Sequence, residues 1–430
     1  MKSVIFTLIG GAAAFPFVAN APGVNSPWSG SGLHRLRARQ QPGGEGAGSE
    51  ANCPYNPNHV PAAPFNPKYP YNNAKNGQMG NQKGGYLVPA KGDTAHQFVA
   101  PNPKTDIRGP CPGLNAAANH NFLAHDGVTT FDELVDAQQN VYNVGYDLAL
   151  LLATLGLTLT DGDVVTEKLS IGCDATSRTS FNPALTGSEP GLDGHDKFEA
   201  DSSLTRNDFF LDNGNDFSFN GTLFGYMASV AESTGGGNFD FNAMSAYRKQ
   251  RYDQSRAENG NFYFGPLALL LYGASSFVYE LMPTAGGPAD LATVSSFFGT
   301  SKNSAGQWVF NNNEQIPPNW YARVEPYSNN DVTTQILEQY LKYPVLFGGN
   351  TGKAGGSFDA VSFGAIQNGT ISSSISATQT SCLLYQLATG SVPSYLNGVL
   401  TPSVKALSFV LEKLTSNPTF KNLGCPIPLT

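Results

Sequence analysis

The sequence has few charged residues and no long apolar segment. Only 13% of its 430 residues are charged, and the net charge is −8. An acidic balance of this kind argues against nucleic acid as a partner. The chain contains no cysteine–histidine spacing of a zinc site, no phosphate-binding loop and no internal repeat. Its apolar run from Val4 to Phe15 is too short to cross a membrane, so we expect no membrane anchor.

Glycine and proline are abundant instead, with 47 and 29 residues, and 40% of the chain is hydrophobic. This composition predicts a sizeable core with long loops. Residues 1–21 have the pattern of a secretory signal peptide: Lys2, a short apolar stretch, then small-residue cleavage sites. Residues 22–100 lack hydrophobic periodicity and are interpreted as a propeptide or an extended arm. We therefore expect a secreted protein whose folded domain spans residues 101–430.

The periodic segments predict helices, and strand signals are few and short. Thr130 and Glu133 form a capping box that opens a predicted helix running through Leu155. Pro266 is placed as the first residue of another helix. That helix is predicted over 266–281, and further helices over 114–123, 239–258, 331–341 and 403–414. The fold class we predict is mainly α, a single helical domain with long loops.

One cysteine lies between two prolines, in the run Pro110-Cys111-Pro112-Gly113-Leu114-Asn115. Each proline fixes its own φ and removes a backbone donor, so Cys111 is expected on a stiff turn. The predicted helix that follows would direct N–H groups at the sulfur and favour the thiolate. A fixed thiolate is a metal ligand or a nucleophile. A buried or disulfide-bonded cysteine is the alternative interpretation.

A second motif, Gly191 to Arg206, is dense in oxygen donors. Glu199 and Ser203 are four residues apart, so a helical turn would place both on one face. A carboxylate, a hydroxyl and a backbone carbonyl together suit Mg²⁺. An ordinary solvated acidic loop is the alternative, and paired carboxylates such as Glu199 and Asp201 also occur in hydrolases.

The Cys111 run through His120, followed by this acidic motif, resembles the fungal haem-thiolate peroxidases, the family of chloroperoxidase and unspecific peroxygenase. Segments near Trp320 and Phe347 look like those of its longer ascomycete-type members, and the resemblance covers roughly residues 105–350. It implies an all-helical fold and a secreted enzyme. Its substrates would be hydrogen peroxide and small aromatic or apolar organic molecules, which it would oxidise or oxygenate.

The resemblance also implies the cofactors, haem b and Mg²⁺. Cys111 would be the axial ligand of the haem iron, within a haem-binding motif that includes Pro110, Pro112 and Asn115. Mg²⁺ would be held by three residues and a haem propionate: by the Glu199 carboxylate, the Ala200 carbonyl and the Ser203 hydroxyl. Family members usually have glycine or histidine where this chain has Ala200.

The distal side departs from the family pattern. Peroxygenases carry a catalytic glutamate after Tyr-Gly in a distal helix, and this chain has Ala274 there. The nearest acid, Glu280, lies six residues further, about 9 Å along a helix. Glu280 and His195 are the candidate proton-transfer groups. A haem-binding or structural secreted protein with little or no turnover is the alternative function, since Ala274 offers no base.

Five cysteines leave four for disulfides if Cys111 binds iron. The longer family members carry a C-terminal disulfide at similar spacing, which implies a Cys382–Cys425 pair. Cys53 with Cys173 then follows by elimination. Asn220 and Asn368 each begin a glycosylation sequon, as expected for a secreted glycoprotein.

Overall fold

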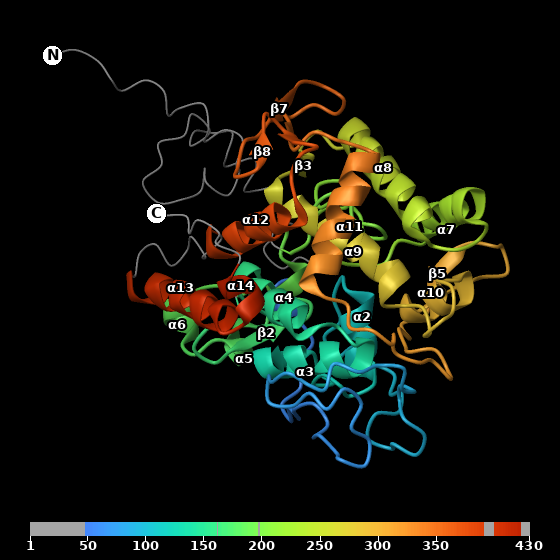
Figure 1. Ribbon diagram of the computed structural model, residues 1–430, viewed down its shortest axis with the longest axis vertical. Coiled ribbons are helices and arrows are strands. Elements are labelled where there is room, and N and C mark those ends of the chain that lie inside the picture. Colours follow the sequence, from blue (N-terminus) through green and yellow to red (C-terminus); the bar gives the residue numbers. More distant parts are fainter. Residues whose placement is uncertain (1–47, 161, 197, 391–399, 423–430) are drawn as a thin grey trace.

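The computed structural model describes residues 48–160, 162–196, 198–390 and 400–422. The predicted signal peptide 1–21, the first part of the predicted arm and Cys425 lie outside these residues. Helices dominate the described chain, and its strands are short pairs between them (Figure 1). The prediction of a mainly α fold is therefore confirmed.

The first half of the chain contains the helix that follows Cys111, α2. This half includes three long or well-formed helices and several single turns, with these bounds: η3 (Glu50–Asn52), α2 (Pro112–Asn119), α3 (Phe131–Tyr142), α4 (Tyr146–Leu159), α5 (Thr176–Thr179), α6 (Pro183–Thr186) and η4 (Gly191–Asp193). Helix α4 is buried on nearly every side, as expected for a helix rich in leucine all round.

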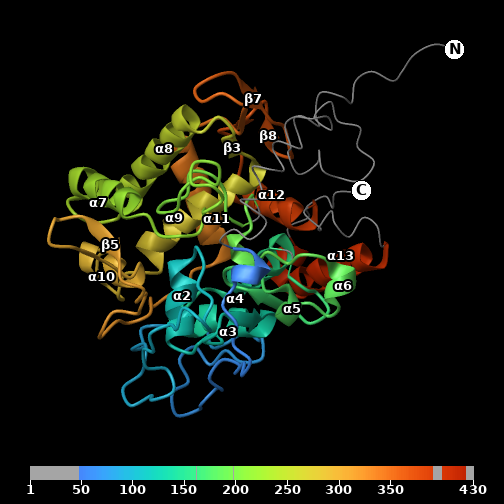
Figure 2. The same cartoon turned by 180° about the vertical axis from the view of Figure 1, so that it is seen from behind.

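The second half supplies the longest helices. Their bounds are α7 (Gly221–Gly235), α8 (Phe241–Glu258), η5 (Pro266–Ala268), α9 (Leu269–Glu280), α10 (Leu291–Phe297), α11 (Asn329–Lys342), α12 (Ala377–Gly390), α13 (Leu400–Thr415) and α14 (Pro418–Lys421). Helix α11 packs along α9 and against α12, while α8 packs against both α7 and α9 (Figures 1 and 2). These helices enclose the main apolar core together with α3 and α4.

The strands of the described residues form four small antiparallel sheets. β1 (Val128–Thr130) pairs with β2 (Lys168–Ser170), so that Val128 lies opposite Ser170. β4 (Thr300–Lys302) pairs with β5 (Trp308–Phe310), and β8 (Ile366–Gln367) with β9 (Thr370–Ile371). β6 (Gly348–Asn350) lies between β3 (Tyr263–Phe264) and β7 (Phe358–Ala360).

The prediction of one continuous helix from Thr130 to Leu155 is wrong, because the chain forms two helices there, α3 and α4. The start of the first helix is as predicted: the Thr130 hydroxyl accepts from the Glu133 N–H at 3.2 Å, and the Glu133 carboxylate accepts from the Thr130 N–H at 3.1 Å. Helix α3 ends where Asn143 takes a left-handed conformation, with φ of 52°. Gly145 then begins α4 so close to the Tyr327 carbonyl that a Cβ would lie 3.1 Å from it.

The other helix predictions are confirmed with small shifts at their ends. Helix α11 begins two residues earlier than predicted, because Ser328 and Asp331 form a second capping box. The Pro266 helix opens with a 3₁₀ turn before α9. The helix after Cys111 is shorter than predicted and ends at Asn119.

Apart from η3, residues 48–100 are irregular chain, and the part from Ala62 to Tyr86 lies against α3, among the blue loops beneath that helix in Figure 1. Their contact is polar and specific: Asn140 of α3 donates to the Ala74 carbonyl at 2.8 Å and accepts from the Ala74 N–H at 3.1 Å. Asn72, Ala74 and Val88 are buried there. Whether this segment is a propeptide or a permanent arm stays a prediction.

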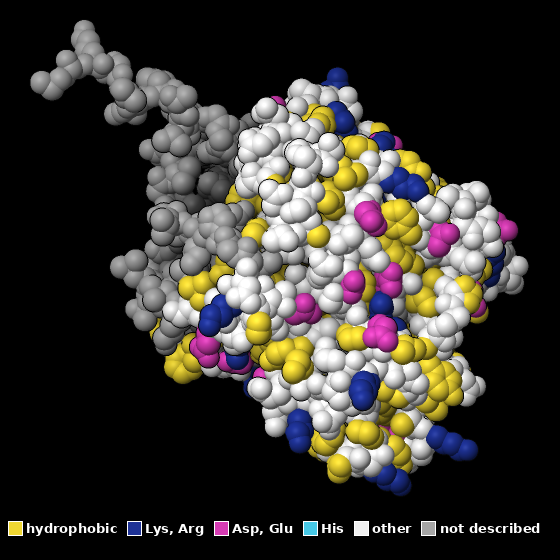
Figure 3. Space-filling model, in the orientation of Figure 1, with side chains coloured by type: hydrophobic (Ala, Val, Ile, Leu, Met, Phe, Trp, Pro, Cys, Tyr) yellow, Lys and Arg dark blue, Asp and Glu magenta, His cyan; other side chains and the backbone are white. Residues whose placement is uncertain are grey.

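In the described part of the chain, none of the helices combines the length and apolar character that a membrane crossing requires. Charged side chains are scattered singly over a face of mostly uncharged residues (Figure 3). This surface reflects the low charged fraction of the sequence.

Candidate functional site

Cys111 is the residue immediately before α2, and Pro112 is the first residue of that helix. Cys111 itself has an extended backbone, with φ of −92° and ψ of 106°. Burial raises the pKa of its thiol, although the N–H groups of Leu114 and Gly113 and the Arg206 guanidinium act in the opposite direction. Binding of a metal ion there would release the thiol proton, because the thiolate is the ligand.

Two side chains fix the turn around this thiol. Asn115 forms a pair of hydrogen bonds with Gly109: its Nδ2 donates to the Gly109 carbonyl at 2.9 Å, and its Oδ1 accepts from the Gly109 N–H at 3.0 Å. On the other side, the Tyr142 hydroxyl of α3 donates to the Gly113 carbonyl at 2.7 Å. Both contacts hold backbone that flanks Cys111, so the sulfur has a defined position.

The cysteine pairing supports a separate role for this thiol. Cys53 and Cys173 form a disulfide, which confirms the pairing reached by elimination. Among the described residues Cys111 is free. Cys382 lies in α12, but its predicted partner Cys425 falls outside the described residues, so that pair stays a prediction.

The predicted cation motif forms a largely buried, acidic cluster of side chains. The Ser203 hydroxyl donates to the Ala200 carbonyl at 3.0 Å, so two of the three predicted ligands are in contact. The third, Glu199, is buried; its Oε2 lies 2.9 Å from Nδ1 of His195, and its Oε1 has no hydrogen-bond partner among the described residues. A buried carboxylate oxygen without a donor is well suited to a cation.

The structure adds Asp216 to this group. Ligand atoms of His195, Glu199 and Asp216 lie within 4.8 Å of one another, a spacing at which they could hold a metal ion. Asp216 is fully buried, and its Oδ2 lies 3.4 Å from His195 Nδ1. The sequence motifs did not single it out, because it lies outside the acidic motif from Gly191 to Arg206.

His195, a predicted proton-transfer candidate, lies among these carboxylates. Burial disfavours its charge, but Asp196, Asp216 and Glu199 outweigh that effect and raise its pKa well above the usual range. Its ring stacks on Phe209 with centroids 4.4 Å apart. A charged imidazole held in this way orients Glu199 and is poorly suited to accept a proton.

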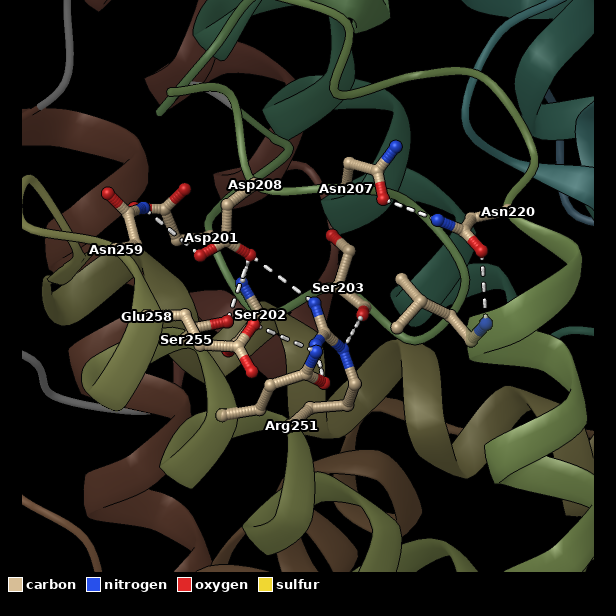
Figure 4. Close-up of polar contacts among 12 residues, drawn as sticks. Asp201, Ser202, Ser203, Asn207, Asp208, Asn220, Arg251, Ser255, Glu258 and Asn259 are labelled. Carbon is tan, nitrogen blue, oxygen red and sulfur yellow. Dashed lines mark hydrogen bonds and ion pairs between the residues drawn. The ribbon is translucent and has the colours of Figure 1, made fainter. Parts of the chain in front are cut away.

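Helix α8 holds the loop that follows Glu199 (Figure 4). Arg251 donates from Nε to the Ser203 carbonyl at 2.9 Å and pairs with Asp208 at 3.3 Å. Arg248, one turn earlier, donates to the Ser202 carbonyl and, at 2.8 Å, to its hydroxyl. Both arginines are buried. The loop's backbone is thus bound to helical side chains, which sequence reasoning missed because no local pattern links α8 to the motif.

Asp208 completes this support. Its carboxylate accepts from the Ser202 N–H at 3.0 Å, the Ser255 hydroxyl at 2.9 Å and the Asn259 amide at 3.0 Å. It is 1% exposed, so each of these donors is satisfied away from water.

Helix α9 contains two of the positions considered for proton transfer, Ala274 and Glu280. Ala274 is exposed, whereas Gly273 and Ser275 on either side are buried. Glu280, at the end of α9, accepts from Arg323 at 2.7 Å and from Gln335 at 2.6 Å. Both of its oxygens are engaged in an ion pair and a hydrogen bond, which is the arrangement of a structural carboxylate.

A buried carboxylate near Cys111 was not predicted at all. Glu314, 1% exposed, accepts from the Asn115 amide at 2.9 Å, and burial raises its pKa to about 7. Nothing in the sequence near position 314 signals this contact, because its partner is 199 positions away.

The two sequons differ in their surroundings. Asn220 is the N-cap of α7, accepting from the N–H groups of Thr222 and Leu223, and its Nδ2 donates to Asn207 at 2.6 Å. Asn368 is exposed at the turn between β8 and β9. The attachment atom is therefore more accessible at Asn368, and glycosylation of either residue stays a prediction.

We predict that Asp208→Ala destabilises the protein by about 3 kcal/mol or more, because it leaves Arg251 buried without its ionic partner. The free energy of unfolding, measured by denaturant titration, checks this. Asp253→Asn is the matched control on α8: Asp253 pairs with Lys249 at the surface, where such pairs contribute about 0–1 kcal/mol. Equal losses in both variants would contradict the role given to Asp208.

Comparison with known proteins points to one family. Residues 96–325 match the family described as "Peroxidase, family 2". The chain is 29% identical over 351 residues to an aromatic peroxidase, fscJ, of Fusarium equiseti, covering 77% of this chain and 78% of the relative. It is 32% identical over 298 residues to an aromatic peroxygenase of Cyclocybe aegerita, covering 68% and 71%. It is 30% identical over 283 residues to the dothistromin biosynthesis peroxidase dotB of Dothistroma septosporum, covering 64% and 66%.

Proposed function

The chain belongs to peroxidase family 2, a family of hydrogen-peroxide-dependent haem-thiolate peroxidases and peroxygenases, and we propose that it is a secreted member acting on small aromatic or apolar organic molecules. The relatives named aromatic peroxidase and aromatic peroxygenase support this substrate class. The observation that carries the proposal is the geometry of Cys111, a free thiol on a backbone turn that two side chains hold in place.

The residues around this turn fit a thiolate-ligated haem. Cys111 is half-buried at a helix N-terminus, and the Gly113 and Leu114 N–H groups favour its anionic form. A bound haem supplies the iron at which peroxide is cleaved, and an axial thiolate favours O–O cleavage. Asn115 and Tyr142 would keep the sulfur in place for binding the iron, since they hold the backbone on both sides of Cys111.

We assign the cation, Mg²⁺, to the Glu199 carboxylate, the Ala200 carbonyl and the Ser203 hydroxyl. The Oε1 of Glu199, which has no hydrogen-bond partner among the described residues, supports this, because a cation there would compensate the buried carboxylate. His195 holds the other oxygen of Glu199 and Arg251 holds the Ser203 carbonyl, so both ends of the ligand set are oriented by charged side chains.

The proton that moves between the two peroxide oxygens has no evident carrier on α9. A methyl group stands at Ala274, where the family resemblance places a glutamate, and Glu280 is occupied by Arg323 and Gln335. A general base contributes about 10²–10⁴-fold to such steps. We therefore expect slow peroxide cleavage relative to family members that have the glutamate.

This same observation favours a second candidate function, a haem-binding secreted protein of this fold with little or no turnover. Secretion in either case rests on the predicted signal peptide and is supported by the Cys53–Cys173 disulfide, a bond typical of proteins folded in an oxidising compartment. The two candidates differ in catalysis alone.

Turnover of a simple phenol by the purified, haem-loaded protein tests the proposed function. We expect product formation that requires hydrogen peroxide and exceeds the rate of the same concentration of free haem. Cys111→Ala should reduce this rate to that of free haem, because the axial thiolate is lost. A haem-loaded wild-type protein that turns over no phenol would favour the second candidate, and full activity in Cys111→Ala would exclude the ligand assignment.

Restoring the missing carboxylate should accelerate the reaction. We predict that Ala274→Glu raises kcat at least about tenfold, because it restores a base at the position where the family resemblance places the catalytic glutamate. Ala274→Gln is the matched control, since it has nearly the same size and cannot accept the proton. Steady-state rates at equal haem content check this; an equal gain in both variants, or no gain in either, would show that position 274 does not limit turnover.

A further inference from the structure

Glu314 is a buried carboxylate on the Cys111 side of the fold, in the loop after β5. Its Oε1 accepts from the Asn115 amide at 2.9 Å and lies 3.8 Å from an Arg206 guanidinium nitrogen. Its Oε2 is buried and has no hydrogen-bond partner among the described residues. Both Glu314 and Arg206 are at most 5% exposed, so their charges are weakly screened by water.

Helix α2 and its C-cap residue His120 hold the segment that carries Glu314 through three side chains. Besides Asn115, the Asn119 amide donates to the Glu314 backbone carbonyl at 2.7 Å, and His120 Nε2 accepts from the Ile316 N–H at 3.3 Å. Gly299 also packs closely against the Glu314 backbone: a Cβ on Gly299 would lie 2.7 Å from the Glu314 nitrogen. The carboxylate therefore has a fixed position relative to the helix that begins at Cys111.

The link from Glu314 to the thiol is both mechanical and electrostatic. The Asn115 amide donates to Glu314 and also pairs with the Gly109 backbone. Glu314 therefore orients the side chain that holds the Cys111 turn. The charge of Glu314 also acts on the sulfur directly: it raises the pKa of Cys111, whereas Arg206 lowers it. An anion near a thiolate makes that sulfur a stronger electron donor.

We propose that Glu314 is a positioning residue for the axial thiolate, holding Asn115 against the Cys111 turn and, opposed by Arg206, setting the electron density on the sulfur. This inference rests on the proposed haem-thiolate function and deepens it. The role of Glu314 does not follow from family membership, because it depends on contacts between α2 and the loop after β5.

The charge on Glu314 changes with pH in the neutral range. Burial raises its pKa to about 7, although Arg206, the Asn115 hydrogen bond and Arg108 act against burial. Its charge acts on the Cys111 thiol and on the Tyr142 hydroxyl of α3, and His120, the C-cap residue of α2, contacts the same loop at the Ile316 N–H. Burial raises the pKa of Tyr142 well above its usual range and lowers that of His120 to about 4, so neither titrates near pH 7.

The reduction potential of the haem-loaded protein tests the proposal. One electron from a mediator dye reduces the ferric iron, and a nearby anion disfavours that gain of negative charge. We expect Glu314→Gln to have a higher potential than wild type at about pH 8.5, where Glu314 is ionised, and a much smaller difference at about pH 5.5, where it is protonated. If Glu314→Gln and wild type have the same reduction potential as each other at both pH values, the proposal is overturned.

Asp136→Asn is the matched control. Burial also raises the pKa of Asp136 to about 7, but this carboxylate lies on α3 and accepts from the Gly77 N–H at 3.1 Å, away from the turn. Its variant should follow the wild-type potential at both pH values. If Glu314→Gln fails to fold, Glu314→Asp replaces it, and the reduction potential is measured across the pH range for this variant and for wild type. A change in potential whose midpoint pH differs between the two proteins supports the proposal. The same midpoint pH in both contradicts it.

The absorption spectrum separates this test from that of the proposed function. Wild-type protein without thiolate-ligated haem would refute the proposed function before any potential is measured. A normal thiolate spectrum with equal potentials in wild type and Glu314→Gln would refute the role of Glu314 alone.

Discussion

The placement of one thiol is the constraint on which the rest of the site depends. Two prolines stiffen the backbone around Cys111, and Asn115 and Tyr142 bind its neighbours Gly109 and Gly113. Tyr142 comes from α3, which ends there because Asn143 leaves the helical conformation. The break between α3 and α4, the docking of α2 and the turn itself therefore form one assembly, in which moving any part displaces the sulfur.

The acidic side of the site depends on buried charge pairs. Glu199, Asp201, Asp208 and Asp216 are buried together, an arrangement that is costly unless cations or donors compensate it. Arginines of α8 and His195 supply part of that compensation. A bound cation would supply more, so we expect the loop after Glu199 to gain stability on binding Mg²⁺.

Local signals predicted much of this structure, and long-range contacts account for what was missed. The capping box at Thr130 and the proline at 266 act within a few residues, so the starts of those helices could be predicted. The break at Asn143 could not, because the apolar periodicity continues through it and the approach of the Tyr327 backbone decides it. Likewise, Cys111 and Glu199 lie in recognisable motifs, whereas Asp216 and Glu314 join the site through folding alone.

The spectrum of the reduced, carbon-monoxide-bound protein is the most direct measurement. We would purify the secreted protein after supplying haem during expression, and record this spectrum without added substrate. Thiolate ligation by Cys111 predicts the strongly red-shifted Soret band of a haem-thiolate protein. A protein that binds no haem, or one whose carbon-monoxide form lacks that shift, would contradict the assignment of Cys111 as the axial ligand.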